Sequence, residues 1–167
     1  GKSTLGRVLI HLEESTAGNI EFDRKDITVL KKRELKKFRE DAQMIFQDPY
    51  SSLNPRYTIE DIIMEPLLLS RKYSRNEARQ KTTELMNFVG IAQRLRLSYP
   101  HELDGGRRQR IGIARALSVR PEFIVCDEPV SALDVSIQAQ VLNLLMDLQE
   151  ERGLTYMFVT HNLSVVK

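Results

Sequence analysis

The most informative stretch of this chain for its fold is Phe123-Ile124-Val125-Cys126-Asp127-Glu128. Four consecutive apolar residues followed by two acids are typical of a strand that is buried on both faces of a parallel sheet and ends at a ligand-binding edge. Two other apolar runs, Ala42 to Phe46 and Tyr156 to Thr160, are also followed by a polar residue, Gln47 and His161 respectively. Helical patterns separate the three runs, so the sequence predicts an α/β fold with a parallel sheet and crossover helices.

Composition places the chain among ordinary globular proteins. It has 167 residues, of which 41% are hydrophobic and 29% charged, which suits one compact domain. The net charge of +2 is too small to indicate nucleic acid or an anionic membrane as the main partner. No apolar run approaches the roughly 18 residues that span a bilayer. The single cysteine, Cys126, excludes an internal disulfide and favours a reducing, cytoplasmic setting.

A change of pattern divides the chain. Thr58 to about Leu97 contains helical patterns and no good strand, and Ser74 is a plausible N-cap. We therefore expect residues 1–47 and 107–167 to form an α/β core, with 48–106 as a helical insertion. Within the insertion we expect a loop at 48–56 and helices at 58–69 and 74–89. Elsewhere we expect helices at 1–12, 31–39, 107–119 and 135–150 and a short strand at 20–22.

One helix of the insertion carries a group of apolar residues with two possible roles. These residues fit either the core or a surface that docks on another protein: Met64, Leu67, Leu68 and Leu69.

Gly1-Lys2-Ser3-Thr4 begins a helix and matches the last four positions of the Walker A loop. Free N–H groups at a helix N-terminus attract phosphate. In such a loop, Lys2 reaches the β- and γ-phosphates of ATP and the Ser3 hydroxyl ligates Mg²⁺. Taken alone, four residues also fit a chance helix start.

The two acids that follow the Phe123–Cys126 run complete a Walker B pattern. Asp127 is suited to hold Mg²⁺ through water, and Glu128 to polarise an attacking water as general base. The alternative is a strand that ends in two surface acids. The Walker A match upstream favours the catalytic interpretation.

Leu103-Asp104-Gly105-Gly106-Arg107 resembles the signature of the ABC ATPase family, Leu-Ser-Gly-Gly-Gln before a helix. In the same family order, Gln47 matches the Q-loop glutamine and His161 the switch histidine. The D-loop is matched by Ser131, Ala132, Leu133 and Asp134. The resemblance covers essentially the whole chain. A glycine pair at a helix start also offers an N-terminal anion site, and nothing else in the sequence explains the pair.

The resemblance implies a P-loop NTPase (RecA-like) core with an inserted ABC-type helical subdomain, using ATP and Mg²⁺. It implies that Glu128, His161 and Gln47 are catalytic, and that Ser3, Gln47 and Asp127 hold the metal. Two such domains are expected to dimerise head to tail, each signature acting on the partner's ATP, while the helical subdomain docks on a membrane permease.

Two longer stretches resemble the oligopeptide and dipeptide importers, Phe46 to Arg56 and Glu128 to Gln140. They imply ATP-driven peptide import at the cytoplasmic face of the cell membrane. The partners would be a second ATPase subunit (identical or different), permease subunits and, indirectly, an extracytoplasmic substrate-binding protein, without nucleic acid.

Other functions remain open at this point. Nickel and glutathione importers share much of these stretches. A soluble ABC ATPase acting on nucleic acid or ribosomes is the alternative of another class, but the sequence has no long coiled-coil insertion. A non-hydrolysing partner in an asymmetric pair is a third possibility, against which Glu128 and His161 argue.

The signature departs from the family at two positions, with Asp104 in place of Ser and Arg107 in place of Gln. Both Ser and Asp are good N-caps, but an ionised Asp cannot donate a hydrogen bond to phosphate. A carboxylate near phosphate charge costs on the order of 1–4 kcal/mol before compensation. Our hypothesis is that the two substitutions are coupled, with Arg107 pairing with Asp104 at i,i+3 or contacting the phosphate.

Both ends of the chain resemble cuts in a longer protein, since Gly1 lies inside a motif and Lys167 follows an apolar run. On this interpretation the strand that precedes the phosphate loop is absent, and we expect its place to be beside the Phe123–Cys126 strand. A chain without it is expected to bind ATP poorly.

Overall fold

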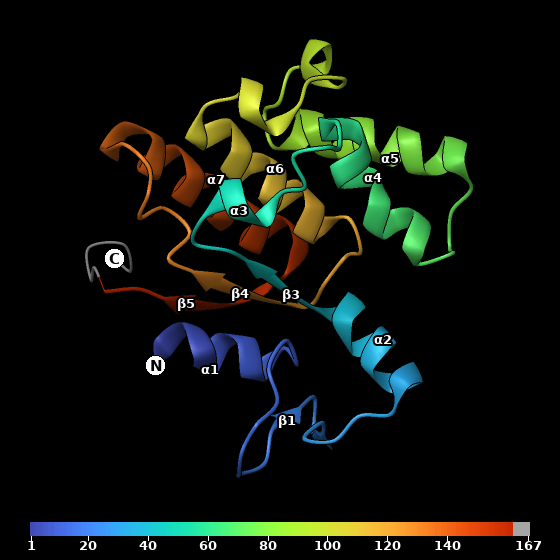
Figure 1. The fold of residues 1–167 in the computed structure, drawn as a ribbon, viewed down its shortest axis with the longest axis vertical. Helices are drawn as coiled ribbons and strands as arrows, with labels where there is room; N and C mark the ends of the chain where they lie inside the picture. The colour runs from blue at the N-terminus through green and yellow to red at the C-terminus, as the bar shows by residue number, and fades with distance from the viewer. Residues whose placement is uncertain (162–167) are drawn as a thin grey trace.

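The core of the molecule is a parallel sheet of three strands in the order β3-β4-β5 (Figure 1). The computed structural model describes residues 1–161, so the last six residues of the predicted core, 162–167, lie outside the described part. The strands are β3 (Ala42–Ile45), β4 (Phe123–Asp127) and β5 (Thr155–Val159). The predicted α/β fold with a parallel sheet is therefore confirmed.

Strand β4 occupies the middle of this sheet. Its register pairs Ala42 with Phe123 on one side and Phe123 with Thr155 on the other. Because both edges of β4 are paired, the prediction that a further strand belongs beside it is wrong. An additional strand could extend this sheet only at the outer edge of β3 or β5.

Successive residues of β4 face two different hydrophobic layers, as alternation along a strand requires. Ile124 and Cys126 pack with helices α6 (Gly105–Leu117) and α7 (Val135–Arg152). Val125 faces the other layer, which contains Ile10 at the end of α1 (Lys2–Leu9). In Figure 1, α6 and α7 cover one face of the sheet and α1 lies against the other.

Gly6 brings α1 close to the sheet. A Cβ at this position would lie 2.9 Å from Cγ1 of Val125, which is too close for two carbon atoms. The absence of a side chain therefore sets the depth of α1, and with it the distance of its N-terminus from the ends of the strands.

The segment predicted as a helical insertion contains α4 (Ile59–Leu69) and α5 (Arg75–Phe88), followed by single 3₁₀ turns at Gln93–Leu95 and Pro100–Glu102. Thr58 and Ser74 cap the two helices, each accepting the N–H of the residue three positions later. Met64 and Leu67 are buried, whereas Leu68 and Leu69 are 36% and 65% exposed. The apolar group on α4 thus divides into core residues and surface residues.

Several predicted bounds shift by one or two residues, and three local predictions differ more clearly from the structure. The segment expected as a loop contains one helical turn, α3 (Pro49–Ser52), because Asp48 caps it and proline at its first position is preset for a helix. Helix α1 ends at Leu9, three residues before the predicted end at residue 12. The first strand is limited to β1 (Glu21–Phe22), which pairs antiparallel with β2 (Lys25–Asp26).

The basic helix α2 (Lys32–Asp41) lies at the side of this hairpin in Figure 1. Among residues 1–161, no helix is both long enough and apolar enough to cross a bilayer.

Candidate active site

Polar side chains from four segments meet at the carboxyl edge of the sheet. Ser3, in the first turn of α1, donates a hydrogen bond from Oγ to Oδ1 of Asp127, at 2.9 Å. Lys2 donates from Nζ to the carbonyl oxygen of Thr160, also at 2.9 Å. The first turn of α1 is therefore hydrogen-bonded to the carboxyl ends of both β4 and β5.

Asp127 and Ser3 form a donor set that fits magnesium. The Asp127 residue is only 3% exposed, and a buried carboxylate requires a cation or several donors. Within residues 1–161, no group of three or more His, Cys, Asp or Glu side chains is arranged to hold a metal ion. A carboxylate and a hydroxyl match Mg²⁺, which takes few protein ligands and completes its shell with water and phosphate.

The N-terminus of α1 fits a phosphate group. Gly1 occupies the N-cap position and supplies no side-chain hydrogen bond to the first turn. The first N–H groups of a helix have no partner within it, and they carry the positive end of the helix dipole. Lys2 adds a cation at the same place.

Glu128 lies between Gln47 and His161. Gln47 donates from Nε2 to Oε2 of Glu128 at 3.0 Å, and Nδ1 of His161 lies 2.9 Å from Oε1. The Glu128 side chain is 16% exposed, and that of His161 is 67% exposed. The three residues assigned to catalysis from the sequence are therefore in direct contact.

The backbone of Glu128 adopts a left-handed conformation with φ of 43°. Non-glycine residues in this region carry strain of about 1–3 kcal/mol, and they gather at functional sites. Its position is further fixed by Ser131, whose N–H and hydroxyl both donate to the Glu128 carbonyl oxygen at 3.2 Å.

The pKa of Glu128 is lowered from its ordinary value. The largest cause is the hydrogen bond from His161, and smaller contributions come from the charge of His161, Ser131 and Lys2, while partial burial opposes them. Glu128 is therefore an ionised carboxylate at neutral pH, in the form that accepts a proton.

The segment predicted as the D-loop leads from Glu128 into α7. Asp134 occupies the N-cap position of α7 but makes no side-chain cap hydrogen bond. Leu133 is fixed from α7, because Gln138 donates from Nε2 to its carbonyl oxygen at 2.9 Å. Ala132 lies between these anchored residues and Ser131.

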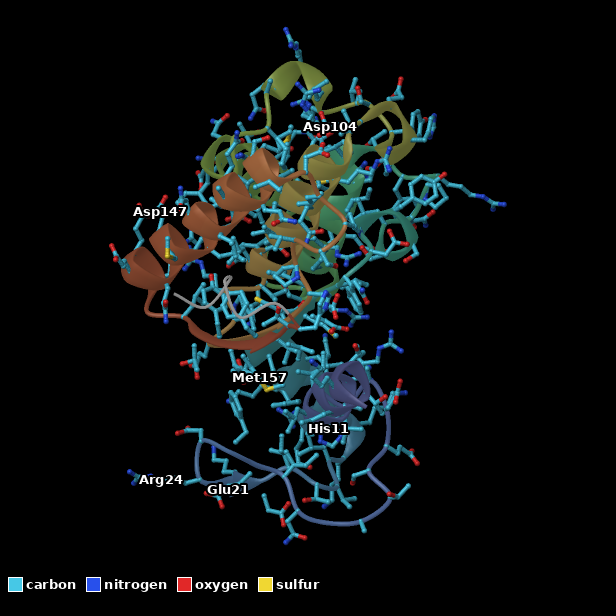
Figure 2. All side chains as sticks on the ribbon, turned by 90° about the vertical axis from the view of Figure 1, so that its left-hand side faces the viewer. His11, Glu21, Arg24, Asp104, Asp147 and Met157 are labelled. Carbon is cyan, nitrogen blue, oxygen red and sulfur yellow. The ribbon has the colours of Figure 1, made fainter. Side chains whose placement is uncertain are left out.

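The signature residues surround the start of α6. Leu103 is buried, and Asp104 is the N-cap, its Oδ1 accepting the N–H of Arg107 at 2.8 Å. Oδ2 of Asp104 lies 3.3 Å from Nη1 of Arg107, so the ion pair expected at i,i+3 is confirmed. Figure 2 shows Asp104 at the opposite end of the molecule from Glu21 and Arg24 of the hairpin.

Close packing explains the glycine pair of the signature. A Cβ on Gly106 would lie 2.6 Å from Cγ2 of Ile137, and one on Gly105 would lie 3.2 Å from Cδ2 of Leu133. The statement that only an anion site accounts for these glycines is therefore wrong, because α7 and the segment before it lie against the start of α6.

Sequence reasoning gave a role to Arg107 but overlooked Arg115 on the same helix. Arg115 lies in the apolar run Ile111 to Leu117, and a lone cation in such a run was the available signal. It lines a cavity of about 700 Å³ together with Ser3, Gln47 and Asp127. Further lining comes from Arg7, Arg39 and Asp48, so three arginines and two aspartates line the cavity beside the candidate magnesium site.

The sequence of this chain is similar to those of known ATP-binding proteins. The family model described as ABC transporter matches residues 1–131. The oligopeptide transport ATP-binding protein AppF of Bacillus subtilis is 54% identical over all of this chain, which covers 51% of that protein. The di/tripeptide transport ATP-binding protein DppF of Pseudomonas aeruginosa is 48% identical over all of this chain, which covers 52% of it. The chain thus spans about half the length of the curated relatives it matches.

A solved structure is similar as well. The ATP-binding cassette MJ0796, a dimer in a post-hydrolysis state bound to ADP and Pi, superposes with a TM-score of 0.86 at 33% identity. The match covers 99% of this chain and 72% of that one. A cassette fold, a shared family model and relatives that are about half identical over the length of this chain all agree: this chain belongs to the ABC transporter family.

Proposed function

We propose that this chain forms the nucleotide-hydrolysing part of an ATPase that drives peptide uptake. The observation that carries the proposal is the contact of Glu128 with both Gln47 and His161, next to the Ser3–Asp127 pair. This arrangement places an ionised base beside a donor set suited to Mg²⁺ and a helix N-terminus suited to phosphate.

Each residue has a distinct task in this proposal. The N–H groups of α1 and the Lys2 ammonium bind phosphate oxygens, and Ser3 and Asp127 hold Mg²⁺, with Gln47 as a further candidate ligand. The magnesium ion, when bound, neutralises phosphate charge. Glu128 accepts a proton from water, while His161 keeps the carboxylate ionised and oriented. Gly1 and Thr4 complete the phosphate-binding turn.

The wider assembly is part of the same proposal. Two cassettes pair, and the segment Leu103 to Arg107 of one together with Ser131 to Asp134 acts on nucleotide held by the other. The insertion 48–106 docks on permease subunits at the cytoplasmic face of the membrane. The names of the relatives support oligopeptides or dipeptides as cargo. In this proposal an extracytoplasmic binding protein delivers the cargo to the permease.

A paired substitution tests the catalytic assignment. In the complete protein, Glu128→Gln removes the base and is expected to lower the ATPase rate by about 10²–10⁴-fold, with nucleotide binding retained. Glu122→Gln makes the same chemical change beside the opposite end of β4, where the side chain is exposed, and serves as control. Equal rates for the two variants would refute the role of Glu128.

A further inference from the structure

Gln47 belongs to a short segment that lies against the signature helix. Residues 47–53 leave the end of β3, form the single turn α3 and end at Leu53, which is 2% exposed and part of the main core. Gln47 itself contacts Glu128. The position of Gln47 relative to the base therefore depends on what fixes this segment.

Arg115 fixes the segment from inside the fold. Its Nη1 donates to the carbonyl oxygen of Ser52 at 2.6 Å, and its guanidinium carbon lies 5.9 Å from the centre of the Phe46 ring. Burial lowers the pKa of this guanidinium, and the charge of Glu65 on α4 opposes the shift. One side chain of α6 thus contacts residues on both sides of Gln47.

Arg108 makes a second contact of the same kind. It precedes Arg115 by seven residues, or about two helical turns, so both side chains leave the same side of α6. Its guanidinium carbon lies 5.0 Å from the centre of the Tyr50 ring, and its Nε donates to the carbonyl oxygen of Pro100 at 2.9 Å. The α3 turn is therefore joined to α6 by two arginines.

We propose that Arg115, with Arg108, is a positioning residue that makes residues 47–53 and helix α6 move as one body. A displacement of Gln47 at the base then shifts Asp104 at the start of α6. About 16 Å of continuous helix separates Arg115 from that start. Because this helix is unbroken, a displacement at Arg115 moves its N-terminal end as well. The inference rests on the proposed function, because Gln47 matters here through its contact with a catalytic base.

Arg115→Gln in the complete protein tests this link, with Arg110→Gln as matched control. Arg110 lies on the same helix and also holds other segments through its guanidinium, but its two hydrogen bonds go to Val89 and Gln140. Without nucleotide, amide hydrogen exchange of residues 47–53 is expected to become about 10-fold faster in Arg115→Gln and to stay within about 2-fold in Arg110→Gln. Equal exchange in the two variants overturns the proposal.

A double-mutant cycle separates positioning from general destabilisation. Gln47→Ala is expected to lower the ATPase rate of the otherwise unchanged protein. In the Arg115→Gln background the fold-loss caused by Gln47→Ala should be at least about threefold smaller, because the link is already broken. Rate losses that simply multiply overturn the proposal even if exchange changes. Arg115→Lys, which keeps the charge and one donor, should restore part of the coupling, and it replaces Arg115→Gln if that variant does not fold.

The failure of the link and the failure of the proposed function have different signatures. A parent protein without Glu128-dependent ATPase activity refutes both. A parent protein with that activity, in which Gln47 and Arg115 act independently, refutes the link alone.

Discussion

The hydroxyl of Ser3 donates a 2.9 Å hydrogen bond to the carboxylate of Asp127, although 124 positions separate the two residues in the chain. The contact joins the first turn of α1 to the end of the central strand. It aligns a hydroxyl, a carboxylate and a set of free helical N–H groups, which together favour a magnesium–phosphate complex over either ion alone.

Replacing Asp127 by Asn is expected to raise the Mg²⁺ concentration needed for half-maximal ATPase activity by about 10–100-fold, because a charged oxygen ligand is lost. A magnesium titration at fixed ATP measures the effect. Asp147→Asn provides the control, since Asp147 is exposed on α7 (Figure 2). An unchanged magnesium requirement in Asp127→Asn would remove this residue from the metal site.

Glu128 should make the stability of the protein depend on acidity below about pH 5. Its folded-state pKa is lower than the ordinary value of 4.5, chiefly through the hydrogen bond with His161. The stabilisation is therefore complete above about pH 4.5 and is lost as pH falls through the lower folded value. Urea unfolding of the parent and Glu128→Gln should show a stability difference that shrinks from about pH 5 to pH 3. A difference that stays constant over this range contradicts the expectation.

Gly106→Ala is expected to destabilise the fold by about 1–3 kcal/mol, because the new Cβ would lie 2.6 Å from Ile137. Gly112→Ala on the same helix has no atom within 4 Å of the new Cβ, and it should be neutral or stabilising by about 0.5–1 kcal/mol. Thermal unfolding distinguishes the two. Ile137→Ala should recover part of the loss in Gly106→Ala; if it does not, the clash is not the cause.

Asp104→Ala should cost about 1 kcal/mol of stability, because the cap on the Arg107 N–H is lost. Asp104→Ser keeps a capping oxygen and should lower the stability by only a few tenths of a kcal/mol. The exposed ion pair itself contributes little, about 0.2–1 kcal/mol, so the cap dominates. Chemical denaturation of the three proteins gives these values, and equal losses in the two variants would rule out capping as the main role.

The ATPase rate tests whether Asp104 and Arg107 act as a pair. Asp104→Ser and Arg107→Gln, made singly and together in the assembled complex, should have combined effects that differ from the product of the single effects. The reason is that each single change leaves one charge of the pair uncompensated. Effects that multiply would mean that the two departures from the family signature are independent.

Local chemistry made several elements predictable. Ser74 and Thr58 each offer a side-chain oxygen at a helix start, and both cap helices in the structure. The apolar run from Phe123 to Cys126 could only be buried on both faces, and it forms the central strand. The α3 turn was missed because one capped turn has too few residues to produce a helical period.

Contacts between distant segments were not predictable from local patterns. The place of a further strand was wrongly assigned because the sequence of one strand does not specify which strands lie beside it in the sheet. The packing of Gly106 on Ile137 depends on how α6 packs against α7. The periodicity within either helix does not predict that packing. Arg115 was overlooked for the same reason, since its partners are Phe46, directly after β3, and Ser52 of α3.

Local patterns in the sequence specified the three strands of the parallel sheet, the capped starts of α4 and α5 and the residue types that carry the chemistry, because propensity, capping and burial patterns act within a few residues of each other. Only the tertiary structure decided that Ser3 meets Asp127, that Gln47 and His161 hold Glu128, and that the glycines of the signature serve packing. Those relationships come from the strand order and from the depth at which helices lie on the sheet. Both are set by the fit of side chains across the whole core.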